Sequence, residues 1–215
     1  MSKPERVGPV AGLLALVLLV VNLVATRESP TPDTPTAKMV TELLDHRNAY
    51  VASAALILAQ AVLLLVFVVA IAAVVDREDS WIGRVASLAG CAASVLAMAS
   101  AVSLLAAVFT VDHEPTGAAW VPLEFHTFFL ASTAVPLAAF LLAIGAAAVS
   151  RGTLNRVLAW ASLAIGVGLA FGGLYGFGGE LDGGVFGAVW FVSGLAFFVW
   201  IVAASIALLR RPIAV

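Results

Sequence analysis

Three histidines, His46, His113 and His126, are the residues of this chain best suited to chemistry. Imidazole and carboxylate groups together suit zinc, copper or iron, and Glu124 and His126 stand near the start of the same expected helix. There is no HExxH motif and no histidine pair at i and i+4. A metal or haem site made of His46, His113, His126 and Glu124 therefore depends on the fold bringing these residues together. The nearby carboxylates are those of Asp45, Asp112, Glu114 and Glu124.

The other motifs that carry chemistry are absent from the sequence. No GxSxG nucleophile motif occurs, and the serines of the apolar stretches have no histidine at the same depth. No phosphate-binding GxxxxGK[ST] occurs either. The lone cysteine, Cys91, excludes an intramolecular disulfide and a CxxC redox pair. We expect no catalytic residue and, the histidine site apart, no cofactor, which favours a non-enzymatic protein.

The composition is that of a membrane protein. Of 215 residues, 62% are hydrophobic and 11% are charged, whereas globular domains have roughly 45–50% and about 25%. Because one bilayer crossing takes about 20 apolar residues, the length allows six or seven crossings. We expect one transmembrane domain over residues 1–215, in contact with the lipid bilayer. The 11 basic residues are scattered, which excludes a nucleic-acid partner.

Charged or Gly/Pro-rich interruptions divide the chain into six apolar runs. They do not alternate in polarity as the strands of a transmembrane barrel do. The fold class predicted is an all-α, polytopic transmembrane helix bundle with six spans. The expected spans are residues 7–25, 50–75, 85–111, 123–149, 157–177 and 185–209.

The basic residues predict the orientation of these spans. If the six runs alternate, eight of the basic residues fall on one side and three on the other, which by the positive-inside rule places both termini in the cytoplasm. We expect a multi-pass protein of the plasma membrane, and the excess of arginine over lysine is typical of a bacterial source. The alternative is that residues 7–25 belong to a cleaved signal peptide, which would leave five spans; Leu23 at the −3 position opposes it.

The outer loop, residues 26–49, changes character along its length. Its first part contains three prolines, which favour an extended backbone. The second part predicts a short amphipathic helix with Thr34 as N-cap, which lies along the outer surface before the second span. Its apolar face carries Met39, Val40, Leu43 and Leu44. We expect it to cap the bundle, with a docking surface for a partner as the alternative.

Small residues recur at four-residue spacing in the fifth span, at Ala164, Gly168, Gly172 and Gly176. This spacing places them on one helix face, where backbones can approach closely. We expect helix packing there, with a groove for a lipid, a small molecule or a second subunit as the alternative. In the fourth span, Pro136 predicts a kink, and Ser132 or Thr133 would help satisfy the freed carbonyl.

The layout resembles a known group of proteins. The landmarks are a basic start, the residues 42–47 (ELLDHR) before a long second span, and the residues 155–160 (NRVLAW) at the start of the fifth. They resemble the small, mostly actinobacterial, six-helix integral membrane proteins that are grouped in families without an assigned activity. The resemblance implies the architecture and carries no site residue with it.

Three functions are compatible with these observations. The first is a non-enzymatic accessory bundle that binds a membrane protein partner or forms a homo-oligomer. The second is a transporter or channel for a small solute, suggested by the glycine face and Pro136. Ionisable residues, which mark most pumps and proton-coupled transporters, are missing from the middle of the spans. The third is a metal- or haem-binding protein that uses the outer histidines.

Overall fold

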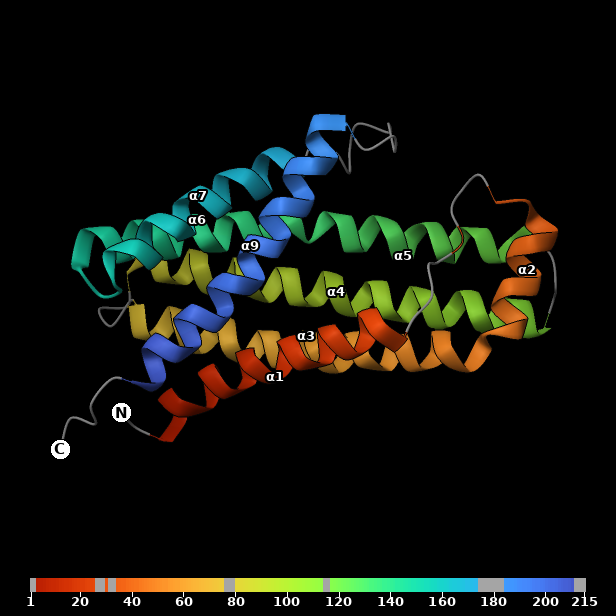
Figure 1. Cartoon of the computed structure of the whole chain (residues 1–215), viewed down its shortest axis with the longest axis horizontal. Coiled ribbons are helices and arrows are strands. Elements are labelled where there is room, and N and C mark those ends of the chain that lie inside the picture. The colour runs from red at the N-terminus through yellow and green to blue at the C-terminus, as the bar shows by residue number, and fades with distance from the viewer. Residues whose placement is uncertain are drawn as a thin grey trace.

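The protein is described by a computed structural model, which places residues 3–25, 30, 34–75, 80–113, 117–173 and 184–210. These residues form α-helices and one 3-10 turn without any strand (Figure 1). The all-α prediction is confirmed. The helices are α1 (Lys3–Ala25), α2 (Thr36–Asp45), α3 (Arg47–Val75), α4 (Trp81–His113), η1 (Gly117–Ala119), α5 (Trp120–Ser132), α6 (Ala134–Arg151), α7 (Arg156–Gly173) and α9 (Gly184–Leu209).

Six stretches of the described chain are long and apolar enough to cross a membrane, as predicted: Arg6–Val24, Arg47–Val75, Trp81–His113, Gly117–Arg151, Arg156–Gly173 and Val185–Leu209. The described part of the fifth ends at Gly173, so the expected residues 174–177 lie outside the described residues. The second, third and fourth stretches are longer than the sequence predicted. Their ends carry residues that periodicity and hydropathy alone assign to loops.

The six long segments pack in a closed ring. Going round the ring, α1 contacts α3, α3 contacts α4, α4 contacts α6, α6 contacts α7, α7 contacts α9, and α9 contacts α1. The first residues of α1 and the last of α9 lie at the same end of the bundle, which we call the termini end (Figure 1). An even number of membrane crossings brings the chain back to the end at which it began. Glycines allow the helices to approach closely. A Cβ on Gly8 would overlap the Ala70 side chain of α3, and a Cβ on Gly90 would overlap the Val68 side chain.

Two separate cores hold the molecule together. The larger one fills the ring and includes Phe67, Phe140 and Trp200. The smaller one lies at the opposite end, under α2, and joins α2 to α3, α4, η1 and α5. Its buried residues are Met39, Leu43, Tyr50, Ala54, Ala101, Leu104, Ala107, Val108, Val111, Ala119 and Leu123.

The smaller core belongs to a part of the bundle that extends past α1. Gly8 lies against Ala70 and Gly12 against Phe67, so the antiparallel register places the end of α1 near about residue 54 of α3. In Figure 1, α3, α4 and α5 continue beyond that point to α2, and neither α1 nor α9 accompanies them. We call this part the α2 extension: α2, residues 47–54 of α3, 101–113 of α4, and residues 117–123.

Helix α2 lies across the ends of α3, α4 and α5 (Figure 1). Met39 and Leu43 are buried as its predicted apolar face requires, but Leu44 is 42% exposed. The predicted N-cap is wrong by one residue, because α2 begins at Thr36 and Pro35 occupies the N-cap position without a side-chain hydrogen bond. A turn at His46 then leads directly into α3.

The predicted interruption of the fourth span is present. α5 ends at Ser132 and α6 begins at Ala134, four residues and two residues before Pro136. Proline has no N–H, so the carbonyl four residues earlier loses its partner. For Pro136 this carbonyl belongs to Ser132. The Thr133 hydroxyl donates instead to the Leu130 carbonyl at 2.7 Å, so the prediction that it would satisfy the freed carbonyl is wrong.

Candidate functional site

The α2 extension gathers most of the polar side chains that sequence analysis selected. Its lower layer is apolar and rigid, because Met39 and Leu43 are fully enclosed between α2 and the helix ends. The start of α2 is tied to the start of α5, since the Trp120 indole donates to the Thr36 hydroxyl at 3.4 Å. The outer face of α2 carries the exposed Lys38 and Asp45. The extension therefore presents a charged surface on a preformed support.

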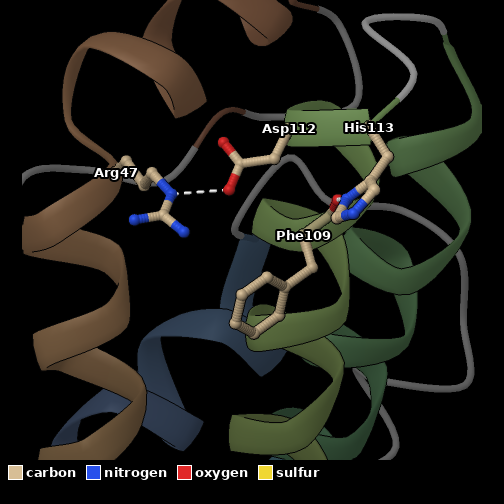
Figure 2. Close-up of polar contacts among 4 residues, drawn as sticks. All are labelled: Arg47, Phe109, Asp112 and His113. Atoms are coloured by element: carbon tan, nitrogen blue, oxygen red, sulfur yellow. Dashed lines mark hydrogen bonds and ion pairs between the residues drawn. The ribbon is translucent and has the colours of Figure 1, made fainter.

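An ion pair joins α3 to α4 at this end. Arg47 Nε donates to Asp112 Oδ2 at 2.6 Å, with side chains 43% and 21% exposed. The Arg47 guanidinium carbon also lies 5.9 Å from the centre of the Phe109 ring, within reach of a cation–π contact. Figure 2 shows Arg47 and Asp112 facing each other across the gap between the two helices. The pair fixes Arg47 in place, so its remaining N–H groups have a defined direction.

The two outer histidines have local partners. His46 Nε2 lies 3.6 Å from Glu42 Oε1, one turn earlier, and this contact is an ion pair only when the imidazole is protonated. His113 Nδ1 lies 2.8 Å from the Phe109 carbonyl, so Nδ1 carries the proton there. In Figure 2 the His113 ring lies on the side of α4 away from Arg47. Both side chains stabilise helix ends.

His126 lies deeper in the bundle, buried between α4 and α5. Its Nδ1 is 2.9 Å from the Ser100 carbonyl and 2.8 Å from Ser100 Oγ. Since a carbonyl can only accept, Nδ1 carries the proton. Ser100 Oγ then donates to the His126 carbonyl at 3.0 Å and completes a reciprocal pair. Ser100 stands 13 residues before His113 on α4, about 20 Å along the helix axis.

The predicted metal ligands do not converge. Glu124 is exposed whereas His126 is buried, because residues two apart on a helix point to opposite sides. Among the described residues, no three His, Cys, Asp or Glu side chains lie close enough to hold a metal ion together. Glu114 lies outside the described residues. A metal or haem at His46, His113, His126 and Glu124 stays a prediction for which this arrangement supplies no ligand set.

The small-residue face of α7 meets α9. A Cβ on Gly168 would meet the Ser193 side chain, and a Cβ on Gly172 would stand 2.7 Å from the Trp190 Cα. Ala164 is exposed, and Gly176 lies outside the described residues. Gly168 and Gly172 thus lie at a helix–helix contact, whereas Ala164 does not share it. Its role as a groove stays a prediction.

Sequence reasoning missed two of the polar pairs that join neighbouring helices. Arg47 and Asp112 are 65 residues apart, and Ser100 and His126 are 26 apart. Each of these four residues lies at a helix end or in an apolar run, and its local sequence does not indicate its partner. The one available signal was that Arg47 and Asp112 fall on the same expected side of the membrane, at the ends of successive spans.

Comparisons with protein-family models, with curated proteins and with solved structures found no match to this chain.

Proposed function

We propose that this protein is a non-enzymatic component of the plasma membrane that binds another membrane protein through the α2 extension. Six apolar, membrane-length segments support the membrane location. The excess of basic residues at the termini end supports cytoplasmic termini and an α2 extension on the outer side.

The observation that carries the proposal is the second core. α4 has 33 residues and is about 50 Å long, whereas the hydrocarbon layer is about 30 Å thick. If the hydrocarbon layer begins near Arg84, it ends near about residue 104 of α4. The rest of α4, with α2 and the ends of α3 and α5, then projects from the membrane around a core of its own.

The surface of this projection has the composition of a binding surface. Leu44 and Phe109 are 42% and 47% exposed, and they stand among Lys38, Asp45 and the Arg47–Asp112 pair. Phenylalanine and arginine, present here as Phe109 and Arg47, are enriched at protein interfaces. A rigid support lowers the entropy lost on binding, because the side chains are already held in place.

Site-directed photo-crosslinking in native membranes tests the proposal. The reagent is a benzophenone maleimide attached to Leu44→Cys, or to Val199→Cys as the control, in a Cys91→Ala background. Val199 is 69% exposed on α9, inside an apolar stretch. We expect a product of discrete mass from position 44 and none from position 199. A product at twice the chain mass would identify the partner as a second copy.

A second variant links the product to the folded extension. Leu43 is 1% exposed beneath α2, and Leu43→Ala removes about 2–5 kcal/mol of packing. Added to the Leu44→Cys chain, it should release α2 and abolish the discrete product. Identical products from positions 44 and 199, or a product that survives Leu43→Ala, would refute docking through the α2 extension.

A further inference from the structure

The membrane part of the bundle contains a cavity of about 390 Å³. Residues of α1, α3, α4, α6, α7 and α9 line it, together with Leu130 of α5, and nearly all of them are apolar. The volume is in the range of small-molecule binding sites, which are about 300–1,000 Å³. An apolar cavity of this kind does not hold ordered water. Its walls favour an apolar ligand over water.

The cavity opens sideways between α1 and α9. Figure 1 shows these helices close together at the termini end and diverging toward the α2 end. Leu23 of α1 and Phe191 of α9 line the cavity, and they are also 68% and 59% exposed. They form its rim on the surface that faces lipid. The cavity is therefore continuous with the hydrocarbon of the bilayer.

Its inner end is closed by aromatic rings. Phe197 lines the cavity and stacks on Trp200, with ring centres 6.2 Å apart. Trp200 packs edge-on against Phe67 and Phe140, and its indole donates to the Leu158 carbonyl at 3.3 Å. These four rings are buried, and they close the pocket toward the termini end.

Its other end is polar. Asn22 and Gln60 both line the cavity, and Asn22 comes three residues before the end of α1. By the register given above, Asn22 is level with about residue 56 of α3, close to the boundary of the hydrocarbon layer, and Gln60 lies about 6 Å deeper. Among the described residues the Gln60 amide makes no hydrogen bond, although an amide in hydrocarbon gains by pairing. The pocket thus runs from amide donors near the boundary to an aromatic floor near mid-membrane.

We propose that this cavity binds one acyl chain of a bilayer phospholipid, which enters sideways between α1 and α9. The chain lies against the apolar walls with its end on the Phe197–Trp200 layer. The ester carbonyl lies at the level of Asn22 and Gln60, whose amide N–H groups donate to it. Two observations select this occupant: the polarity of the pocket matches that of a phospholipid along its length, and the opening is continuous with the lipid-facing surface. The inference does not rest on the proposed docking function.

Photolabelling in defined vesicles tests the assignment. The full-length protein is reconstituted into phosphatidylethanolamine–phosphatidylglycerol vesicles that contain a trace of phosphatidylethanolamine with a diazirine near the end of one acyl chain. Labelled peptides are then mapped by mass spectrometry. We expect labels concentrated around residues 194–198 and 133–137, in preference to the lipid-facing Val199 and Val202.

Gly194 is a suitable position for a variant that fills the cavity, because it lines the cavity and an added Cβ there has no atom within 4 Å. Gly194→Leu fills the pocket without a clash and should reduce pocket labelling about tenfold, the change that corresponds to about 1.4 kcal/mol of lost binding. Ala170→Leu places the same side chain at an exposed position on α7 and should leave labelling unchanged. Gln60→Leu removes the amide and should reduce pocket labelling several-fold.

Unchanged pocket labelling in Gly194→Leu would overturn the proposal, and so would labels spread evenly over the lipid-facing residues. If Gly194→Leu fails to fold by circular dichroism, Ala97→Leu fills the same cavity from the α4 wall and decides the question in the same way. Leu43→Ala, which releases α2, should leave the labelling intact. Failure of the docking proposal and failure of this one are therefore distinguishable.

Discussion

The contact between α7 and α9 gives the sharpest prediction about stability. A Cβ on Gly172 would stand 2.7 Å from Cα and 2.8 Å from N and Cβ of Trp190. Two of these three are backbone atoms, so no side-chain rotation relieves the clash and α9 has to move away as a body. We expect Gly172→Ala to lose about 1–3 kcal/mol through overpacking.

Gly194→Ala is the matched control for this change. It is the same substitution on the neighbouring helix, at a position where an added Cβ meets nothing within 4 Å. Gly194 lies inside α9, where alanine gains about 1 kcal/mol of helix propensity over glycine, and Gly172, next to the described end of α7, gains at most that amount. The difference between the two variants is therefore at least the steric cost. That difference should be about 1–3 kcal/mol in favour of Gly194→Ala.

The assay is unfolding in mixed detergent micelles, followed by circular dichroism and by the fluorescence of the five tryptophans, of which Trp190 is one. Gly172→Ala should unfold at a lower fraction of denaturing detergent than the unmodified protein, and Gly194→Ala should not. Equal unfolding curves for the two variants would refute the close contact of α7 with α9 and the packing role of this face.

Two further predictions concern the polar pairs between helices. Ser100→Ala removes the hydroxyl that joins α4 to α5 and should cost about 0.6–1.7 kcal/mol in the same unfolding assay; Ser94→Ala, whose hydroxyl bonds only within α4, should cost less, and equal losses would contradict the reciprocal pair. Asp112→Asn should cost at most about 1 kcal/mol because the pair with Arg47 is partly exposed. A double-mutant cycle with Arg47→Gln should give a coupling energy that falls as salt is raised, and a coupling independent of salt would contradict the ion pair.

The helices and their approximate limits could be predicted because hydrophobicity along a chain is a local property. Six apolar runs predict six membrane-length helices whatever their neighbours are, and the interruption near Pro136 follows from the missing N–H of proline. The burial of Met39 and Leu43 follows from the helical period in the same way. The predicted helices were too short at their ends. Arg47 and Asp112 are charged and were therefore assigned to loops, whereas their ion pair keeps both residues within helices.

The candidate metal site could not be judged from the sequence. Glu124 and His126 are neighbours in the chain, and yet one is exposed and the other buried. Which side of α5 faces α4 depends on how the two helices pack, and the apolar residues of α5 are spread around the whole helix. The period therefore carries no information about its orientation, and the Ser100–His126 pair appears only once the helices are placed.

The sequence alone determined that the chain is an all-α protein with six membrane-length segments and a short amphipathic helix, because these depend on composition and local period. The tertiary structure decided what these segments enclose. The second core under α2 exists because α3, α4 and α5 extend beyond the end of α1. The lateral cavity exists because α1 and α9 diverge from a common end. Both features depend on the register and angle between helices distant in the chain, and these are set by close contacts such as those at Gly8, Gly12 and Gly172.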